Sequence, residues 1–143
     1  MILPDVNVLL YAHREDVPEY VRYRPWLDRL LAADEPFALS ELVLSAVVRV
    51  ATQPRVYRTP EDVGDVLAYV EALRAQPHAV VVRPGASHWR HFSRLCREGG
   101  ASGKLVADAY HAALAIEHNC EWVTTDRDFA RLPGLRWRHP LDA

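Results

Sequence analysis

The sequence predicts an α/β fold, an α/β/α sandwich in which helices cover both faces of a central, mostly parallel sheet of four or five strands. Short apolar runs alternate with segments of helical periodicity along nearly the whole chain, as is typical of parallel strands joined by helical crossovers. Several of these runs are followed directly by an acidic residue. With 143 residues the chain fits one domain, which we expect to span residues 1–143.

The charge balance argues against a general polyanion-binding protein. The net charge is −2, with 17 basic and 19 acidic residues, and Lys104 is the only lysine among the basic residues. Arginine presents a planar fork that matches phosphate and carboxylate groups. Local basic patches beside an acidic pocket are therefore compatible with this composition.

The sequence also predicts a soluble, cytoplasmic protein with reduced thiols and no membrane partner. Cys96 and Cys120 lie far apart and lack the spacing of metal ligands, so free thiols are expected. Asp5 interrupts the apolar run at the N-terminus, and no apolar stretch approaches the length that spans a bilayer.

The first predicted strand ends at Asp5. Residues 2–6 form a short apolar run, and helical spacing begins at once with Val6, Leu9, Leu10 and His13. A junction of this kind lies at the carboxyl edge of a parallel sheet, where catalytic and ligand groups collect. Asp5 and Asn7 are therefore candidate site residues. Pro4 cannot donate a ladder hydrogen bond, so a central position for this strand requires a gap in the ladder.

A second carboxylate follows the second predicted strand. The next elements in order are a helix over residues 19–33, a strand over residues 37–39 and a helix from residue 41 to about residue 52. Ser40 is the expected N-cap of the last of these helices. Glu41 repeats the arrangement of Asp5, because it also lies just past the end of a strand.

Thr59, Pro60 and Glu61 predict the start of the following helix. A threonine cap, a proline at the first helical position and an acid in the first turn are all helix-start signals, and this helix is expected to run to about Gln76. We assign Glu61 and Asp62 to helix initiation alone.

The next strand, predicted over residues 79–83, ends at Arg83 and delivers no carboxylate. A helix over residues 87–98 follows it. Residues 99–104 are glycine-rich but lack the spacing of a phosphate-binding loop. We expect them to form a flexible hinge.

Two more aspartates complete the candidates. Asp108 lies one turn into a helix predicted over residues 104–118, on an alanine-rich, apolar face, where a carboxylate is costly unless something compensates it. Asp126 follows a strand predicted over residues 121–125 and precedes a helical turn, so both an N-cap and a site role are open for it. Residues 135–138 alternate apolar and basic side chains, as an edge strand would.

A parallel sheet is expected to gather four carboxylates at one edge. They are Asp5, Glu41, Asp108 and Asp126. Clustered carboxylates raise one another's pKa, and the usual relief is a hard divalent cation such as Mg²⁺ or Mn²⁺. The implied chemistry is metal-assisted hydrolysis of a phosphodiester.

With these acidic residues in this order, the chain resembles a known family, the PIN domain, and in particular the VapC-type toxins of bacterial toxin–antitoxin pairs. The motifs that carry the resemblance are Asp5-Val-Asn-Val-Leu-Leu, Ser40-Glu41, Asp108-Ala109 and Thr124-Thr-Asp126-Arg-Asp128-Phe129. The resemblance covers essentially the whole chain. It implies a Mg²⁺- or Mn²⁺-dependent endoribonuclease that cuts structured cellular RNA, usually as a homodimer, and that a cognate antitoxin holds inactive.

The resemblance also implies roles for single residues. Carried over by motif, the acidic site consists of Asp5, Glu41, Asp108 and Asp126, of which Asp5, Asp108 and Asp126 would bind the metal. Asp128 would be an auxiliary acid, and Asn7 and Thr124 would be polar supports. Pro4 departs from the usual start of the family, which affects the local strand geometry more than the chemistry.

Other classes of function remain open from the residues alone. Asp5-Val-Asn-Val approximates the start of haloacid-dehalogenase-like phosphohydrolases, whose first Asp is a nucleophile, although Asn7 stands where a second acid is expected. A non-catalytic binding module could use the acidic pocket to receive an arginine from a partner. A receiver domain is disfavoured, because the strand that ends at Arg83 lacks a phospho-acceptor Asp.

Overall fold

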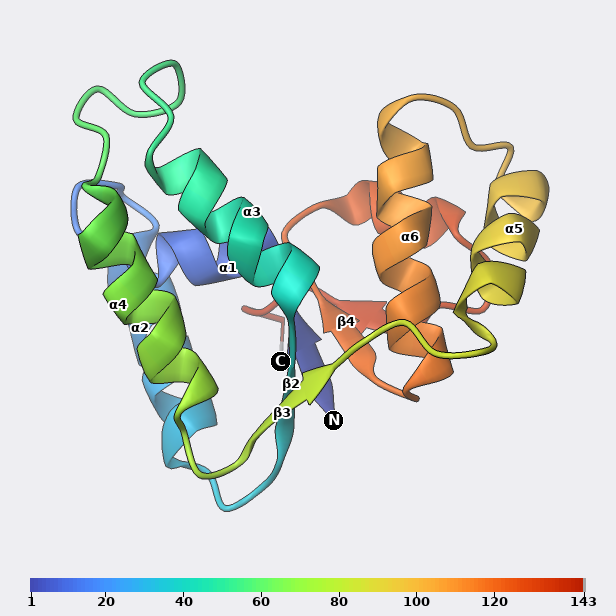
Figure 1. The fold of residues 1–143 in the computed structure, drawn as a ribbon, viewed down its shortest axis with the longest axis horizontal. Coiled ribbons are helices and arrows are strands. Elements are labelled where there is room, and N and C mark those ends of the chain that lie inside the picture. Colours follow the sequence, from blue (N-terminus) through green and yellow to red (C-terminus); the bar gives the residue numbers. More distant parts are fainter. Residues whose placement is uncertain (143) are drawn as a thin grey trace.

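The structure is a computed structural model that describes residues 1–142 (Figure 1). The strands are β1 (Ile2–Pro4), β2 (Phe37–Ser40), β3 (Ala79–Val82), β4 (Glu121–Val123) and β5 (Trp137–Arg138). The helices are α1 (Val6–Tyr11), α2 (Tyr20–Ala32), α3 (Glu41–Ala51), α4 (Val63–Arg74), α5 (His88–Glu98), α6 (Lys104–Glu117) and the 3₁₀ helix η1 (Arg127–Arg131). The predicted alternation of strands and helices is confirmed, and the last strand is shorter than expected.

All strand pairs are parallel, as predicted. In one sheet β4 lies between β1 and β5, and in the other β2 pairs with β3. The register places Pro4 opposite Val123 and Ser40 opposite Val82. These two registers decide which residues meet just beyond the strand ends.

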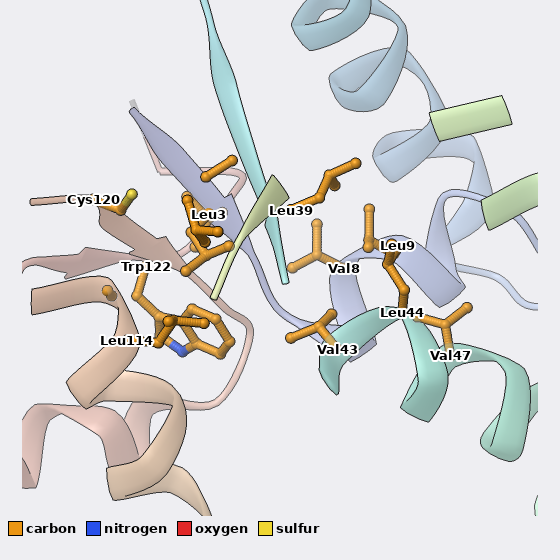
Figure 2. Packing of buried hydrophobic residues seen from close by; sticks show 14 of the residues in the cluster. Leu3, Val8, Leu9, Leu39, Val43, Leu44, Val47, Leu114, Cys120 and Trp122 are labelled. Carbon is orange, nitrogen blue, oxygen red and sulfur yellow. The ribbon is translucent and has the colours of Figure 1, made fainter. Parts of the chain in front are cut away.

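Pro4 explains why the hydrogen-bonded ladder is interrupted between β1 and β2, although the two strands lie side by side (Figure 2). The carbonyl of Met1 accepts from Glu121, and the N–H of Asp5 donates to Val123, so odd-numbered residues of this strand face β4. Backbone groups alternate sides along a strand, so residue 4 faces β2, where proline has no N–H to donate. The predicted gap is confirmed.

Two groups of helices enclose the strands. The helices α1, α2, α3 and α4 lie on one side, and α5 and α6 pack together on the other (Figure 1). Within residues 1–142, no helix is both long and apolar enough to cross a bilayer.

The core lies between these layers and holds the strands in place. Figure 2 shows Leu3 and Leu39 on the strands, with Val8 and Leu44 from α1 and α3 nearby and Trp122 directed toward α6. Trp122, Leu3 and Val8 are completely buried. Each fully buried aliphatic side chain of this kind contributes about 1.5–3 kcal/mol through the hydrophobic effect. The short strands that end at the candidate site are therefore firmly anchored.

The start of α4 differs from the prediction. Its N-cap is Asp62, whose Oδ2 accepts from the N–H of Gly64 at 3.0 Å, and not Thr59. Glu61 is drawn away from the helix start, because its carboxylate contacts His13 Nε2 at 2.7 Å and Arg14 Nη1 at 3.9 Å. The assignment of Glu61 to helix initiation was wrong, since a charged partner on a distant segment replaces the local contact.

This cap can be tested by substitution. Asp62→Ala is expected to lower the free energy of unfolding by about 1 kcal/mol, because the Gly64 N–H loses its acceptor, whereas Asp62→Asn preserves a good cap and should be close to neutral. Urea denaturation measures both. Thr59→Ala is the matched control and should change little. A larger cost for Thr59→Ala than for Asp62→Ala would contradict the cap assignment.

Candidate functional site

Adjacent parallel strands bring the first candidate residues together. Asp5 directly follows β1, and Thr124 directly follows β4. Because Pro4 and Val123 are in register, the next residues along the two strands, Asp5 and Thr124, lie side by side. Asp126 is two residues farther on and caps η1.

The side chain of Asp5 is nearly buried, at 7% exposed, and its carboxylate accepts hydrogen bonds from several donors. Its Oδ1 accepts from the N–H of Val6 at 2.6 Å, so Asp5 is the N-cap of α1. Its Oδ2 accepts from Thr124 Oγ1 at 2.7 Å and, at the longer distance of 3.5 Å, from Asn7 Nδ2. The carboxylate is therefore fixed in one orientation at the end of β1.

Thr124 and Asn7 connect Asp5 with the segment that carries Asp126. Thr124 Oγ1 donates to Asp5 and accepts from the N–H of Asp126 at 3.0 Å. Asn7 Oδ1 accepts from the N–H of Thr125 at 3.3 Å. The two residues that were proposed as polar supports thus lie between the ends of β1 and β4.

Asp126 and Asp108 lie close enough to Asp5 for their charges to raise its pKa, and we call these three residues the aspartate cluster. Asp126 Oδ1 accepts from the N–H of Asp128 at 2.9 Å, so the N-cap role that the sequence left open is present. Its Oδ2 points to a different partner, Lys104. Asp108 is 8% exposed on α6. The side chain of Asp128 itself is exposed.

The electrostatics of the cluster are uneven. The pKa of Asp5 is raised from 3.8 to about 6. Burial is the largest cause, and the charges of Asp108 and Asp126 add to it, while the hydrogen bonds from Thr124 and Val6 act in the lowering direction. The pKa of Asp126 is lowered, because hydrogen bonds from Lys104 and from the N–H of Asp128 outweigh its desolvation. The cluster thus contains one carboxylate that resists ionisation beside one that favours it.

Lys104 is the site residue that sequence reasoning missed. Its Nζ donates to Asp108 Oδ2 at 3.0 Å and to Asp126 Oδ2 at 2.7 Å. The pair with Asp108 has the i,i+4 spacing that favours contact on a helix, so half of this arrangement could have been found from the sequence. The contact with Asp126 depends on how α6 packs against η1.

Glu41 forms its ion pairs with two arginines. It is the first residue of α3, its side chain is 46% exposed, and its carboxylate pairs with Arg83 Nε at 2.9 Å and Arg74 Nη2 at 3.3 Å. The register that pairs Ser40 with Val82 places Glu41 beside Arg83. Within residues 1–142, no three acidic, histidine or cysteine side chains are grouped closely enough to hold a metal ion as they stand.

A groove of about 750 Å³ lies between α3, α5 and α6. Gly103 and Ala107, the chain neighbours of Lys104 and Asp108, line it. Its other walls include Leu42, Arg49, Phe92, Tyr110 and His111. The groove therefore brings aromatic side chains and an arginine together on the helices that flank α6 and on α6 itself.

Comparison with known proteins identifies relatives over nearly the whole chain. The family model described as the PIN domain matches residues 2–135. The protein named VapC ribonuclease Mb2897 from Mycobacterium bovis is 47% identical over 142 residues, which cover 99% of this chain and 97% of that protein. Ribonuclease VapC25 from Mycobacterium tuberculosis is 47% identical over 140 residues, covering 98% and 99%.

Solved structures show the same fold. VapBC2 from Rickettsia felis, bound to a promoter DNA fragment, aligns with a TM-score of 0.71 at 20% identity over 97% of this chain and 98% of that one. FitAcB from Neisseria gonorrhoeae aligns with a TM-score of 0.63 at 20% identity over all of both chains.

Proposed function

This chain belongs to the PIN-domain family, and we propose that it is a Mg²⁺- or Mn²⁺-dependent endoribonuclease that acts as the toxin of a toxin–antitoxin pair. The resemblance inferred from the sequence motifs is thus confirmed at the level of the family. The activity rests on relatives at 47% identity that are named ribonucleases. The haloacid-dehalogenase-like alternative has no support from these comparisons.

One observation carries the proposed chemistry: a buried carboxylate, Asp5, is fixed beside two further aspartates. Three carboxylates and one ammonium leave the cluster with excess negative charge when all are ionised, and the pKa of Asp5 is already raised to about 6. A divalent cation relieves such repulsion, and all available donors are oxygens, which Mg²⁺ and Mn²⁺ prefer. The donor chemistry therefore fits the proposed metal.

Asp5, Asp108 and Asp126 would hold the cation in this proposal. When bound, such a cation polarises a phosphate and lowers the pKa of an attacking water. The role of the chain is to keep the carboxylates in place. Thr124 fixes the orientation of Asp5 and also the backbone of Asp126.

We propose that Glu41, which directly follows β2, also belongs to the acidic site. Its partners, Arg83 and Arg74, are cations whose forks match phosphate oxygens. We propose Asp128, exposed on η1, as an auxiliary acid only. The proposed substrate is RNA, because the relatives are named ribonucleases and the aromatic side chains of the groove between α3, α5 and α6 suit base stacking.

The proposed partners follow from the solved relatives. Several of these are complexes titled as VapBC or as toxin–antitoxin pairs. We propose that this chain likewise binds a cognate antitoxin and forms a homodimer. A binding module without catalysis is the remaining alternative, and it predicts that no divalent cation binds the isolated protein.

Metal binding provides the direct test. Metal-free protein is expected to gain about 2.7 kcal/mol of stability at a cation concentration 100 times Kd, because the cation binds only the folded state. Asp108→Asn should remove most of this gain. The measurement is a thermal-shift series with Mn²⁺ and Mg²⁺, combined with cleavage of total cellular RNA.

Asp62→Asn is the matched control for this experiment. It makes the same chemical change at the start of α4, where asparagine still caps the helix, so its response to metal should equal that of the wild type. Equal responses of Asp108→Asn and Asp62→Asn would show that the cation binds elsewhere. No response in any protein would favour the binding module.

A further inference from the structure

The only lysine of the chain stands at the centre of the acidic cluster. Lys104 is the first residue of α6, and its ammonium bridges Asp108 on the same helix and Asp126 at the start of η1. The two contacts measure 3.0 Å and 2.7 Å. One cation thus joins two elements and two of the three aspartates.

The backbone before Lys104 fixes where this side chain begins. Gly100 and Gly103 have φ angles of 57° and 56°, in the left-handed region that favours glycine. These two glycines lie in the turn from which α6 starts at Lys104. From this first turn the side chain reaches Asp108, four residues on, and Asp126 across the helix packing.

Lys104 is much more exposed to solvent than the two aspartates that it contacts. The Lys104 side chain is 70% exposed, whereas those of Asp108 and Asp126 are 11% and 25% exposed. An exposed ammonium can leave its partners and return to water at little cost. The less exposed carboxylates would then remain close together without a compensating charge.

We propose that Lys104 is the counterion of the acidic site in the metal-free protein and that a divalent cation displaces its ammonium from Asp108 and Asp126. This inference rests on the proposed metal dependence of the same site. The ammonium occupies Asp108 Oδ2 and Asp126 Oδ2, which the proposed cation would also use. Two cations repel each other at such short range, so they compete for these oxygens.

Competition predicts two opposite effects of removing the charge. Lys104→Gln should bind Mn²⁺ more tightly than the wild type, by roughly two- to tenfold, the range expected for one or two lost ion pairs. The same variant should unfold more easily without metal, because Asp108 and Asp126 then lack a counterion. Lys104→Arg keeps the charge and should bind Mn²⁺ with nearly wild-type affinity.

Arg24→Gln is the matched control. Arg24 forms an exposed i,i+4 pair with Asp28 on α2, so this variant loses the same charge and the same kind of contact. Its Mn²⁺ affinity should equal that of the wild type. Calorimetric titration of metal-free protein measures all four affinities.

A direct observation of displacement needs no variant. Because the sequence has one lysine, protein grown with ¹³C-lysine gives a single signal for the methylene next to the ammonium. Titration with Mg²⁺ should move this signal toward the position of a free lysine and sharpen it. The change should saturate at the same Mg²⁺ concentration as the thermal shift.

The possible results distinguish a failure of the counterion role of Lys104 from a failure of the metal dependence. If the wild type binds no divalent cation, the metal dependence itself fails. If Mg²⁺ binds while the lysine signal stays in place and Lys104→Gln has the affinity of Arg24→Gln, the cation site stands and the counterion role is overturned. Loss of metal binding in a folded Lys104→Gln would also overturn it, since that result makes Lys104 a requirement for the cation.

Discussion

Replacing Asp5 by asparagine is expected to reduce RNA cleavage on the order of 10³- to 10⁴-fold, and replacing Asp126 should do the same. The double variant should be hardly worse than either single one, because groups that act as a unit give strongly non-additive losses. The structure supplies the link, since Thr124 Oγ1 contacts Asp5 and the N–H of Asp126 together. The measurement is cleavage of total cellular RNA over a series of metal concentrations.

A third variant and a metal series serve as controls for the losses expected of Asp5→Asn and Asp126→Asn. Asp128→Asn should cost much less, because the Asp128 side chain is exposed and its N–H, which donates to Asp126 Oδ1, is retained. High Mn²⁺ should partly restore the single variants, since their main defect is metal affinity. Losses that simply multiply in the double variant would argue against a common site. The contrary outcome is hydrolysis of a small phosphomonoester without cleavage of RNA, together with an Asp5→Asn variant that is inactive at every metal concentration. That outcome would identify the protein as a phosphohydrolase and not a nuclease.

The second large effect is the loss, as the pH rises from about 4 to about 6, of the stability that Asp5 contributes to the metal-free protein. The pKa of Asp5 is about 6 in the folded protein against 3.8 ordinarily, so in this window the folded state binds more protons than the unfolded state. Stability then decreases with rising pH. At 1.36 kcal/mol per pKa unit, the contribution of Asp5 amounts to roughly 3 kcal/mol.

Comparison with Asp5→Asn isolates this contribution. Other groups act in the opposite direction, because burial lowers the pKa of His111 and hydrogen bonds lower the pKa values of Asp16, Glu117 and Asp126, so their stabilising effects are lost as the pH falls. Since these groups are present in both proteins, the difference between wild type and Asp5→Asn cancels them. Urea denaturation in EDTA between pH 4.5 and 7.5 should show that the free energy of unfolding of the variant increases relative to that of the wild type as the pH rises. Parallel pH curves would mean that Asp5 is not a desolvated, ionising group.

The most reliable sequence predictions concerned features that depend on a few neighbouring residues. Ser40 accepts from the N–H of Val43 as the expected N-cap of α3, and Asp126 takes the N-cap role that the sequence left open for it. These contacts span one turn of chain. The pattern of strands and helices fixes them before any long-range packing is known.

Partners of charged side chains were predicted least well. Glu41 pairs with Arg83, 42 residues away, a partner that the sequence did not predict, because the β2–β3 register brings the two strand ends together. Glu61 was assigned to a helix start, yet it contacts His13, 48 residues away. The sequence shows that a charge is present, but a charge pairs with whichever opposite charge the packing brings within about 4 Å.

The sequence by itself determined the order of the elements, the parallel pairing of the strands and the strand-end positions of Asp5 and Asp126, because hydrophobic periodicity and capping act over a few residues. The tertiary structure alone decided that Thr124 joins Asp5 to Asp126 and that Lys104 bridges α6 and η1. These contacts depend on strand register and helix packing, which burial of the whole core sets.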